Sequence, residues 1–495
     1  MIKNQIKVHA RQSFEVKLDF PAVDFTKGKS DFGMDMFLFL PPALDVNRHN
    51  FTKHDFYKSL KSYIRLSSPS YSLDRILDEN SSFNEEMNVA IDEAALLKNV
   101  KTEHVLIRKV KRYVASVNRG LGDEVKRILV LKDLEKKQHE ARRFIHDCYQ
   151  VRLVFKGILN RIVVSGLTEN TVKAGRLADE YQSLMLEGHF YVLINGLSLK
   201  YEPSATVMTE LDQFVLDEIR YRKRVNYPSV ASSKESNEHL LHRRGRLKRY
   251  IESNLFLNTD TRKEGVFYEQ IFFSLAAGLA MVFATTIAFA SQYAFGNLTL
   301  PFFIVLVISY MFKDRIKELS RMYFDKQRKK MFFDFRTAIS LQKQIQIGFM
   351  QESFRFEKRK YLPLEVREAR ERMRVTEISE EWIGDKVIHY KTKINMSTRK
   401  TRKVEDFEGL TQIFRMNITP FTTKMDDHEK EIFIKSKSKL KRQLINRVYH
   451  LNLIFRFTSG KDVSYKYYKL ITDKLGVKRI DRIAIDESIL LSIKK

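Results

Sequence analysis

The sequence predicts an α+β protein in which a two-helix transmembrane hairpin separates two cytoplasmic regions. The N-terminal region is mainly helical with a small β element, and the C-terminal domain is basic and β-rich. Residues 271–290 form a run of twenty without a charge, which at about 1.5 Å per residue matches the roughly 30 Å hydrocarbon core of a bilayer. Before this run, apolar residues recur every three to four positions, as in helices. After it they alternate or form short runs, as in strands.

These patterns divide the chain into consecutive segments. A length of 495 residues is sufficient for two or three domains, each with its own core. The expected segments are 1–66 (small α+β element), 67–230 (helical cytoplasmic domain), 231–265 (basic juxtamembrane helix), 266–313 (transmembrane hairpin), 314–340 (cytoplasmic helix) and 341–495 (basic β-rich cytoplasmic domain).

The N-terminal element opens with a strand signal, because residues 13–20 alternate polar and apolar side chains with the period of a half-buried strand. Residues 36–40 (MFLFL) indicate a buried strand that ends at Pro41. Thr52 and Asp55 have the spacing of a capping box. A helix is therefore expected from Thr52 to about Leu66.

Residues 83–254 carry mainly helical periodicity, interrupted at 119–122, 165–168 and 202–204. Residues 227–233 (YPSVASS) predict a linker. The basic juxtamembrane helix that follows places its apolar residues on or near one face, so we expect it to lie along the lipid headgroups. These apolar residues are Leu240, Leu247, Ile251 and Leu255.

The second apolar segment, residues 298–312, is short and holds Pro301 in its first turn, so the expected spans are about 271–290 and 296–312. The loop between them, 291–297, has no charge, whereas Lys and Arg flank both segments. Positive flanks stay on the cytoplasmic side, so both termini are expected there. The N-terminus lacks the apolar core of a signal peptide, and the hairpin is expected to target the chain to a bacterial inner (plasma) membrane. A buried hairpin in a soluble core and a re-entrant second segment are the alternatives.

The net charge of +27 is unevenly distributed. Residues 313–495 hold 44 Lys and Arg against 25 Asp and Glu, an excess of 19 positive charges. Anionic membrane lipids are the expected partner, since each nearby cation adds about 1 kcal/mol at an anionic surface. Nucleic acid, stacked on aromatics such as Tyr465 and Tyr467, is the less favoured alternative. The lipid-facing candidates are Arg243, Arg244, Arg246, Lys248, Arg249, Lys313, Arg315, Lys317, Arg321, Arg328, Lys329 and Lys330.

Small residues recur along the first span at four-residue steps, a spacing that lets membrane helices approach closely. They predict packing within the hairpin or, as the alternative, assembly into a homo-oligomer. Neither span holds an Asp, Glu, Lys, Arg or His, which argues against a transporter. The helix-packing candidates are Ser274, Gly278, Ala280, Ala284 and Ala288.

Beyond the hairpin, residues 345–347, 354–356, 387–394, 413–418, 432–434 and 451–457 predict strands of the C-terminal domain. No P-loop, dinucleotide-binding, nucleophile-elbow or H-E-x-x-H motif is present. His146, Asp147 and Cys148 are adjacent on a helix and cannot converge as a triad. The sole cysteine, Cys148, excludes an intramolecular disulfide and is expected in the core. Residues 426–429 (DDHE) predict a solvated turn rather than a metal site.

No catalytic residue, cofactor or metal is therefore expected. The combination favours a non-enzymatic scaffold, adaptor or sensor at the bacterial inner membrane, which recruits a cytoplasmic protein partner. Two alternatives stay open: an oligomeric membrane effector or channel gated by its cytoplasmic domains, and a membrane-tethered enzyme without a recognisable motif.

Overall fold

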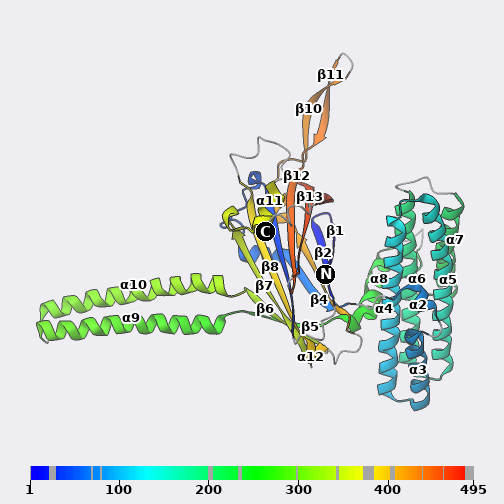
Figure 1. Ribbon diagram of the computed structural model, residues 1–495, viewed down its shortest axis with the longest axis horizontal. Helices are drawn as coiled ribbons and strands as arrows, with labels where there is room; N and C mark the ends of the chain where they lie inside the picture. The colour runs from blue at the N-terminus through cyan, green and yellow to red at the C-terminus, as the bar shows by residue number, and fades with distance from the viewer. Residues whose placement is uncertain are drawn as a thin grey trace. The chain divides into compact units, whose positions relative to one another are not determined.

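The computed structural model describes residues 2–21, 29–67, 71–78, 81–198, 205–231, 237–296, 299–341, 345–371, 384–401, 407–436, 439–460 and 462–484. It is 56% helical and 30% strand, which confirms the α+β class. The chain forms two compact units, a helical unit (Leu66–Phe256) and a β unit (Met1–Arg65 with Leu257–Lys495). Figure 1 shows both units.

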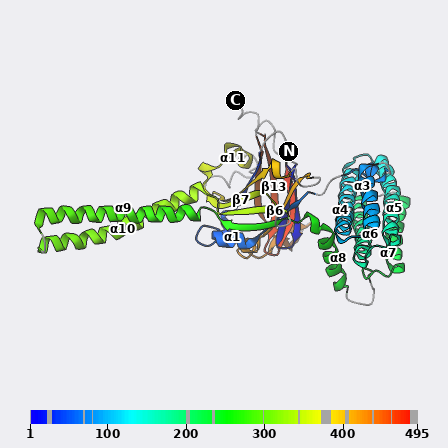
Figure 2. The same cartoon turned by 90° about the horizontal axis from the view of Figure 1, so that it is seen from below.

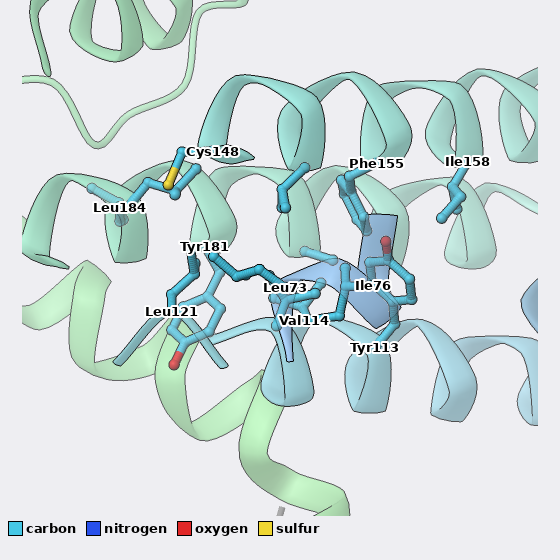
Figure 3. Packing of buried hydrophobic residues seen from close by; sticks show 14 of the residues in the cluster. Leu73, Ile76, Tyr113, Val114, Leu121, Cys148, Phe155, Ile158, Tyr181 and Leu184 are labelled. Carbon is cyan, nitrogen blue, oxygen red and sulfur yellow. The ribbon is translucent and has the colours of Figure 1, made fainter. Parts of the chain in front are cut away.

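The helical unit consists of long helices joined by short connections. Side chains cap several of their N-termini, as where Asn99 accepts from the Thr102 backbone N–H and Asp133 from that of Glu135. The apolar stripes meet in one core, part of which appears in Figure 3, where Cys148, Phe155 and Tyr113 lie among other buried residues. The helices are α2 (Leu73–Leu77), α3 (Ser82–Leu97), α4 (Val100–Val130), α5 (Leu134–Val164), α6 (Glu169–Ser198), α7 (Ala205–Arg224) and α8 (Glu238–Ile251), followed by a 3₁₀ turn (Glu252–Leu255).

Helix α8 corrects one expectation about the lipid surface. Leu240, Leu247, Ile251 and Leu255 are buried within the helical unit rather than free to lie along headgroups. Leu247 and Ile251 belong to the main core of the unit. An amphipathic stripe looks the same whether protein or lipid covers it, so the sequence could not distinguish the two.

The β unit is built around an eight-stranded antiparallel sheet with the order β14-β13-β12-β3-β8-β7-β6-β5. A four-stranded sheet (β1-β2-β9-β4) and a two-stranded ribbon (β10-β11) complete it. The bounds are β1 (Lys3–Ala10), β2 (Ser13–Pro21), β3 (Lys29–Leu40), β4 (Leu60–Leu66), β5 (Asn258–Lys263), β6 (Phe335–Leu341), β7 (Ile345–Glu357), β8 (Lys386–Ser397), β9 (Gly409–Asn417), β10 (Glu429–Ser436), β11 (Lys439–Asn446), β12 (Tyr449–Ser459), β13 (Asp462–Asp473) and β14 (Gly476–Ile483).

The first 65 residues share these sheets with the C-terminal strands and do not form an element of their own. Strand β3 lies between β12 and β8, and β2 pairs with β9. The capping box of Thr52 and Asp55 is present at α1 (Lys53–Ser59). The predicted helix to Leu66 is too long, because residues from Leu60 onward form β4 beside β9. Pairing with a strand far along the chain overrode the local helical pattern.

A helical hairpin replaces the turn between two paired strands at one edge of the large sheet. Strand β5 leads into α9 (Val266–Phe295), which is followed by α10 (Leu300–Met331) and then β6. Lys263 is the register partner of Phe335, and the Glu264 backbone N–H donates to the Asp334 carbonyl oxygen at 3.3 Å. Figures 1 and 2 show α9 and α10 side by side along their length.

Among the described helices, α9 is the one long and apolar enough to cross a membrane. Helix α10 continues without a break from its apolar part into a charged part that begins at Lys313. Length and composition therefore support one membrane-crossing helix, and the expected second span remains a proposal.

Candidate functional site at the base of the hairpin

The lipid-facing candidates before the hairpin lie on α8. Two of them face carboxylates: Arg243 Nη2 lies 2.6 Å from Glu180 Oε2, and Arg244 Nη2 lies 2.5 Å from Glu187 Oε1. The other three, Arg246, Lys248 and Arg249, are exposed. The first pair contributes to packing of α8 against α6, which leaves the exposed three as the cations available to a surface.

The candidates after the hairpin lie along α10. Lys313 Nζ sits 4.1 Å from the centre of the Tyr310 ring, and the Arg321 guanidinium sits 4.4 Å from that of Phe273 on α9. Arg315 and Lys317 are exposed. The side chains of three further candidates fall outside the described residues: Arg328, Lys329 and Lys330.

The helix-packing candidates divide into two faces of α9. Ala280 is buried, Ala284 and Ala288 are half-buried, and the Ala284 carbonyl oxygen lies 3.5 Å from Ser309 Oγ of α10. Ser274 and Gly278 are exposed, and a Cβ added at Gly278 would meet nothing within 4 Å. The alanines thus pack within the hairpin, while Ser274 and Gly278 lie on an open face.

A large open pocket of about 940 Å³ lies where α10 returns to the sheet. Four cationic side chains line it, from the loop before α1, from α1 itself, from α10 and from β7: Arg48, Lys53, Lys326 and Arg355. The aromatic side chains of Phe51 and Phe356 also line the pocket. Asp334 and Glu357 also line the pocket, so its four cations leave an excess of two positive charges. This excess and the apolar walls favour an anionic ligand that also has an apolar part.

Asp334 joins this pocket to the hairpin, because it occupies the short connection between α10 and β6. Its carboxylate accepts from Lys53 Nζ at 2.5 Å, from the Tyr57 hydroxyl at 3.1 Å and from the Phe354 backbone N–H at 2.8 Å. Burial, with the Asp334 charge adding to it, raises the pKa of Tyr57 far above its ordinary value, so this hydroxyl stays a donor. The end of α10 is thereby tied to α1 and β7.

A buried acid lies beside this junction. The Tyr390 hydroxyl donates to the Glu352 carboxylate, and the Asp334 backbone N–H donates to the Glu352 carbonyl oxygen at 2.7 Å. Burial raises the pKa of Glu352, and burial also raises the pKa of Tyr390. Neither residue stands out in the sequence, since a lone Glu or Tyr in an alternating strand predicts an outward side chain.

His389 on β8 lies between two carboxylates. Its Nε2 is 2.9 Å from Asp35 Oδ1, its Nδ1 is 3.8 Å from Glu357 Oε1, and its ring stacks on Phe37 with centroids 4.4 Å apart. Burial alone would lower the pKa of His389, but the two carboxylates outweigh it and raise the pKa above its ordinary value. Both ring nitrogens are directed at acceptors, so the imidazolium is stabilised and has no lone pair for general-base catalysis.

This arrangement predicts a pH-dependent contribution to stability. Because the folded-state pKa is raised, the contribution is complete below the ordinary pKa near 6.5 and is lost as pH rises through the folded-state value. His389→Gln should therefore lower the free energy of unfolding by about 1.5–3 kcal/mol at pH 6 and by less at pH 9. Denaturant unfolding of both proteins at the two pH values measures the difference.

His450 on β12 supplies the matched control. Burial, then Lys469 and Arg479, lower its pKa. Because a lowered pKa disfavours the folded state at low pH, His450→Gln should cost less at pH 6 than at pH 9. An equal loss at both pH values for His389→Gln would contradict the assignment.

A second buried polar cluster lies in the helical unit. Arg152 of α5 is 2.8 Å from Asp179 Oδ1 of α6 and 3.0 Å from Glu218 Oε1 of α7, with all three buried. The hydroxyls of Tyr221 and Tyr227 each donate to Asp179 Oδ2 at 2.8 Å. Burial alone would lower the pKa of Arg152, yet the carboxylates of Asp179 and Glu218 raise it. Sequence reasoning missed this cluster because its members are far apart in the chain.

The remaining sequence candidates have ordinary surroundings. Cys148 is fully buried in the helical core, where burial raises the pKa of its thiol. Asp426 accepts from Arg447 at 2.5 Å and Asp427 from Lys474 at 2.7 Å, so both acidic residues of this connection face cations. Within the described ranges, no group of three or more His, Cys, Asp and Glu is placed to hold a metal ion.

Comparison with known proteins adds no relative. No protein-family model matches the chain, no curated protein matches it, and no solved structure matches it.

Proposed function

We propose that this protein is a membrane-anchored, non-enzymatic scaffold or sensor at the inner membrane of a bacterium. The observation that carries the proposal is the insertion of the α9–α10 hairpin between the edge strand β5 and its neighbour β6 in the large sheet. The apolar surface of the hairpin is open: Phe289 of α9 and Leu300 and Phe303 of α10 are each more than half exposed. Apolar side chains exposed side by side are typical of protein or membrane contacts.

The insertion geometry bears on topology. Since β5 and β6 are neighbours, the chain enters and leaves the hairpin at one place, and both flanks lie on one side of any membrane that the hairpin enters. The cationic flanks favour the cytoplasmic side. The proposal is therefore a hairpin anchor of two spans, or of one span and a re-entrant segment, with both termini in the cytoplasm.

The pocket at the hairpin base supports a sensing role over a purely anchoring one. Lys326 of α10 and Asp334 of the α10–β6 connection line the same pocket as Lys53 of α1. An anionic ligand that draws Lys53 away from Asp334 would remove one of the contacts holding the end of α10. Ligand occupancy and hairpin position would then share a residue, and a cytoplasmic partner could respond to either.

Fractionation of the full chain tests the anchor. We expect the protein in the membrane pellet of expressing bacteria, resistant to alkaline carbonate and released by detergent, because the apolar contact of α9 does not depend on charge. Recovery in the carbonate supernatant would identify a peripheral protein and contradict the proposal. A pull-down from the detergent extract then reports the cytoplasmic partner.

A further inference from the structure

The apolar segments of the two hairpin helices do not lie beside each other along their full length. Phe272 stacks on Phe324, with ring centroids 5.0 Å apart. Arg321 lies over the Phe273 ring, and Ser309 Oγ lies beside the Ala284 carbonyl oxygen. In these pairs the two residue numbers sum to about 595. The residue of α10 that lies beside a given residue of α9 therefore has a number of about 595 minus that of the α9 residue.

This register places charges beside the apolar run of α9. The charged part of α10 from Lys313 to Arg321 lies at the level of about residues 273–281 of α9. It includes two carboxylates, Asp314 and Glu318, both exposed. The part of the hairpin in which both helices are uncharged is limited by residues 300–312 of α10, about 20 Å at 1.5 Å per residue.

An uncharged length of about 20 Å falls short of the roughly 30 Å core of an average bilayer. Lys313 and Arg315 can extend their charges toward the headgroups. The carboxylates of Asp314 and Glu318 have shorter side chains, and ionised groups at the bilayer centre are costly. Thinning of the bilayer costs only a fraction of a kilocalorie per ångström. Thinning is therefore the cheaper accommodation.

The tip of the hairpin is also suited to a headgroup layer. Tyr293 is 97% exposed at the end of α9, next to Gln292, and tyrosine is enriched at membrane interfaces. Thr299 caps the start of α10 by accepting from the Phe302 backbone N–H at 3.4 Å. The exposed side-chain amide of Gln292 also needs polar partners, which hydrocarbon lacks. The tip therefore requires the far interface, within reach of a 20 Å hairpin.

We propose that the hairpin is matched to a thin bilayer, and that the partner of this surface is a membrane whose hydrocarbon core is about 20 Å thick at the protein. The inference rests on the proposed membrane anchor and adds to it the class of bilayer that the anchor prefers. Because the cost of thinning grows with every ångström of mismatch, a much thicker membrane leaves the tip below its far interface or takes up less of the protein.

Depth of the tip tests the proposal. The full chain with Tyr293→Cys is labelled with bimane and reconstituted into phosphatidylcholine vesicles with fourteen-, eighteen- or twenty-two-carbon monounsaturated chains, with iodide on both sides. The native thiol, Cys148, is fully buried. Protein without the Tyr293→Cys substitution, treated with bimane in the same way, measures any labelling of Cys148. We expect quenching by iodide to fall as the chains lengthen, and incorporation to favour the thinnest over the thickest bilayer by about tenfold or more.

Substitutions in α10 test whether the uncharged length is the cause. The triple variant Lys313→Leu, Asp314→Leu, Arg315→Leu extends the uncharged run to Ile316, about 6 Å more. It should shift the preference toward thicker bilayers. The matched triple variant Lys313→Gln, Asp314→Asn, Arg315→Gln removes the same charges but adds little apolar length, so it should retain most of the preference for thin bilayers.

The outcomes separate this inference from the anchor itself. Equal iodide quenching in all three bilayers, unchanged in the leucine variant, would overturn thickness matching and indicate that the charged part of α10 lies in a water-filled lumen of an oligomer. Protection from iodide in all three would overturn it as well. Failure to incorporate into any vesicle would refute the membrane anchor instead.

Discussion

Replacing residues 265–333 with an Asn-Gly turn is expected to move the protein completely from the membrane pellet to the soluble fraction while the β unit stays folded. Glu264 and Asp334 are already hydrogen-bonded across the gap, at 3.3 Å, and the strand pairing beyond them is regular from Lys263↔Phe335 to Asn258↔Ser340. Two residues of type I′ geometry join such a pair. The deletion therefore removes the apolar surface without opening the sheet, and it keeps Asp334 with its partners on α1 and β7.

The ribbon of β10 and β11 provides a control of the same design. The Arg447 backbone N–H donates to the His428 carbonyl oxygen at 2.8 Å, so residues 429–446 can also be replaced by an Asn-Gly turn. This variant should remain in the membrane pellet. Fractionation, with circular dichroism of the soluble product, measures both effects. A folded hairpin-deleted protein that still pellets would show that another surface carries the attachment.

Arg152→Met is expected to destabilise the helical unit by about 3–5 kcal/mol, the usual loss when one partner of a buried ion pair is removed. Methionine keeps the packing of the aliphatic part of the arginine side chain, so the loss comes mainly from removal of the guanidinium. Asp179 and Glu218 would be left without their cation, in a site where Asp179 has no exposed surface. Losses of this size are a large part of the stability of a typical domain.

Arg143→Met is the matched control, because Arg143 of the same helix pairs with Asp74 at 2.7 Å while both side chains are at least half exposed. An exposed pair contributes at most about 1 kcal/mol. Urea unfolding followed by the helical signal compares the two variants. Equal losses would show that the buried cluster is not a major source of stability.

Sequence reasoning succeeded where a local pattern decides the structure. The apolar run of α9, the capping box of Thr52 and the alternation along β2 each result from neighbours in the chain, and each appears in the structure. The C-terminal segments predicted as strands lie in β7, β8, β9, β10 and β12 for the same reason, whereas β6, β11, β13 and β14 were not predicted. Local patterns could not show that β3 lies beside β12, because that pairing is set by partners far apart in the chain.

In the candidate site, too, the sequence predicts local features but not contacts between distant residues. Asp334 has no sequence signal beyond its place between two aromatic residues and a strand, and its role depends on α1, which arrives from the other end of the chain. The charged stretch of α10 was visible, but its position beside the apolar run of α9 depends on the helix pairing. Two sequences with identical apolar segments would have different membrane depths if their hairpins paired in a different register.

The pairing of β3 with β12 also determines the order of events during synthesis. Roughly 400 residues separate the two strands. At about 5–20 residues per second, β3 waits about 20–80 seconds for its partner to leave the ribosome. The helical unit and the α9–α10 hairpin are synthesised in that interval, so the proposed anchor would be available while the apolar strand Met36–Leu40 still lacks β12. With the proposed anchor, attachment to the bilayer would precede the pairing of β3 with β12, and with it the closure of the large sheet.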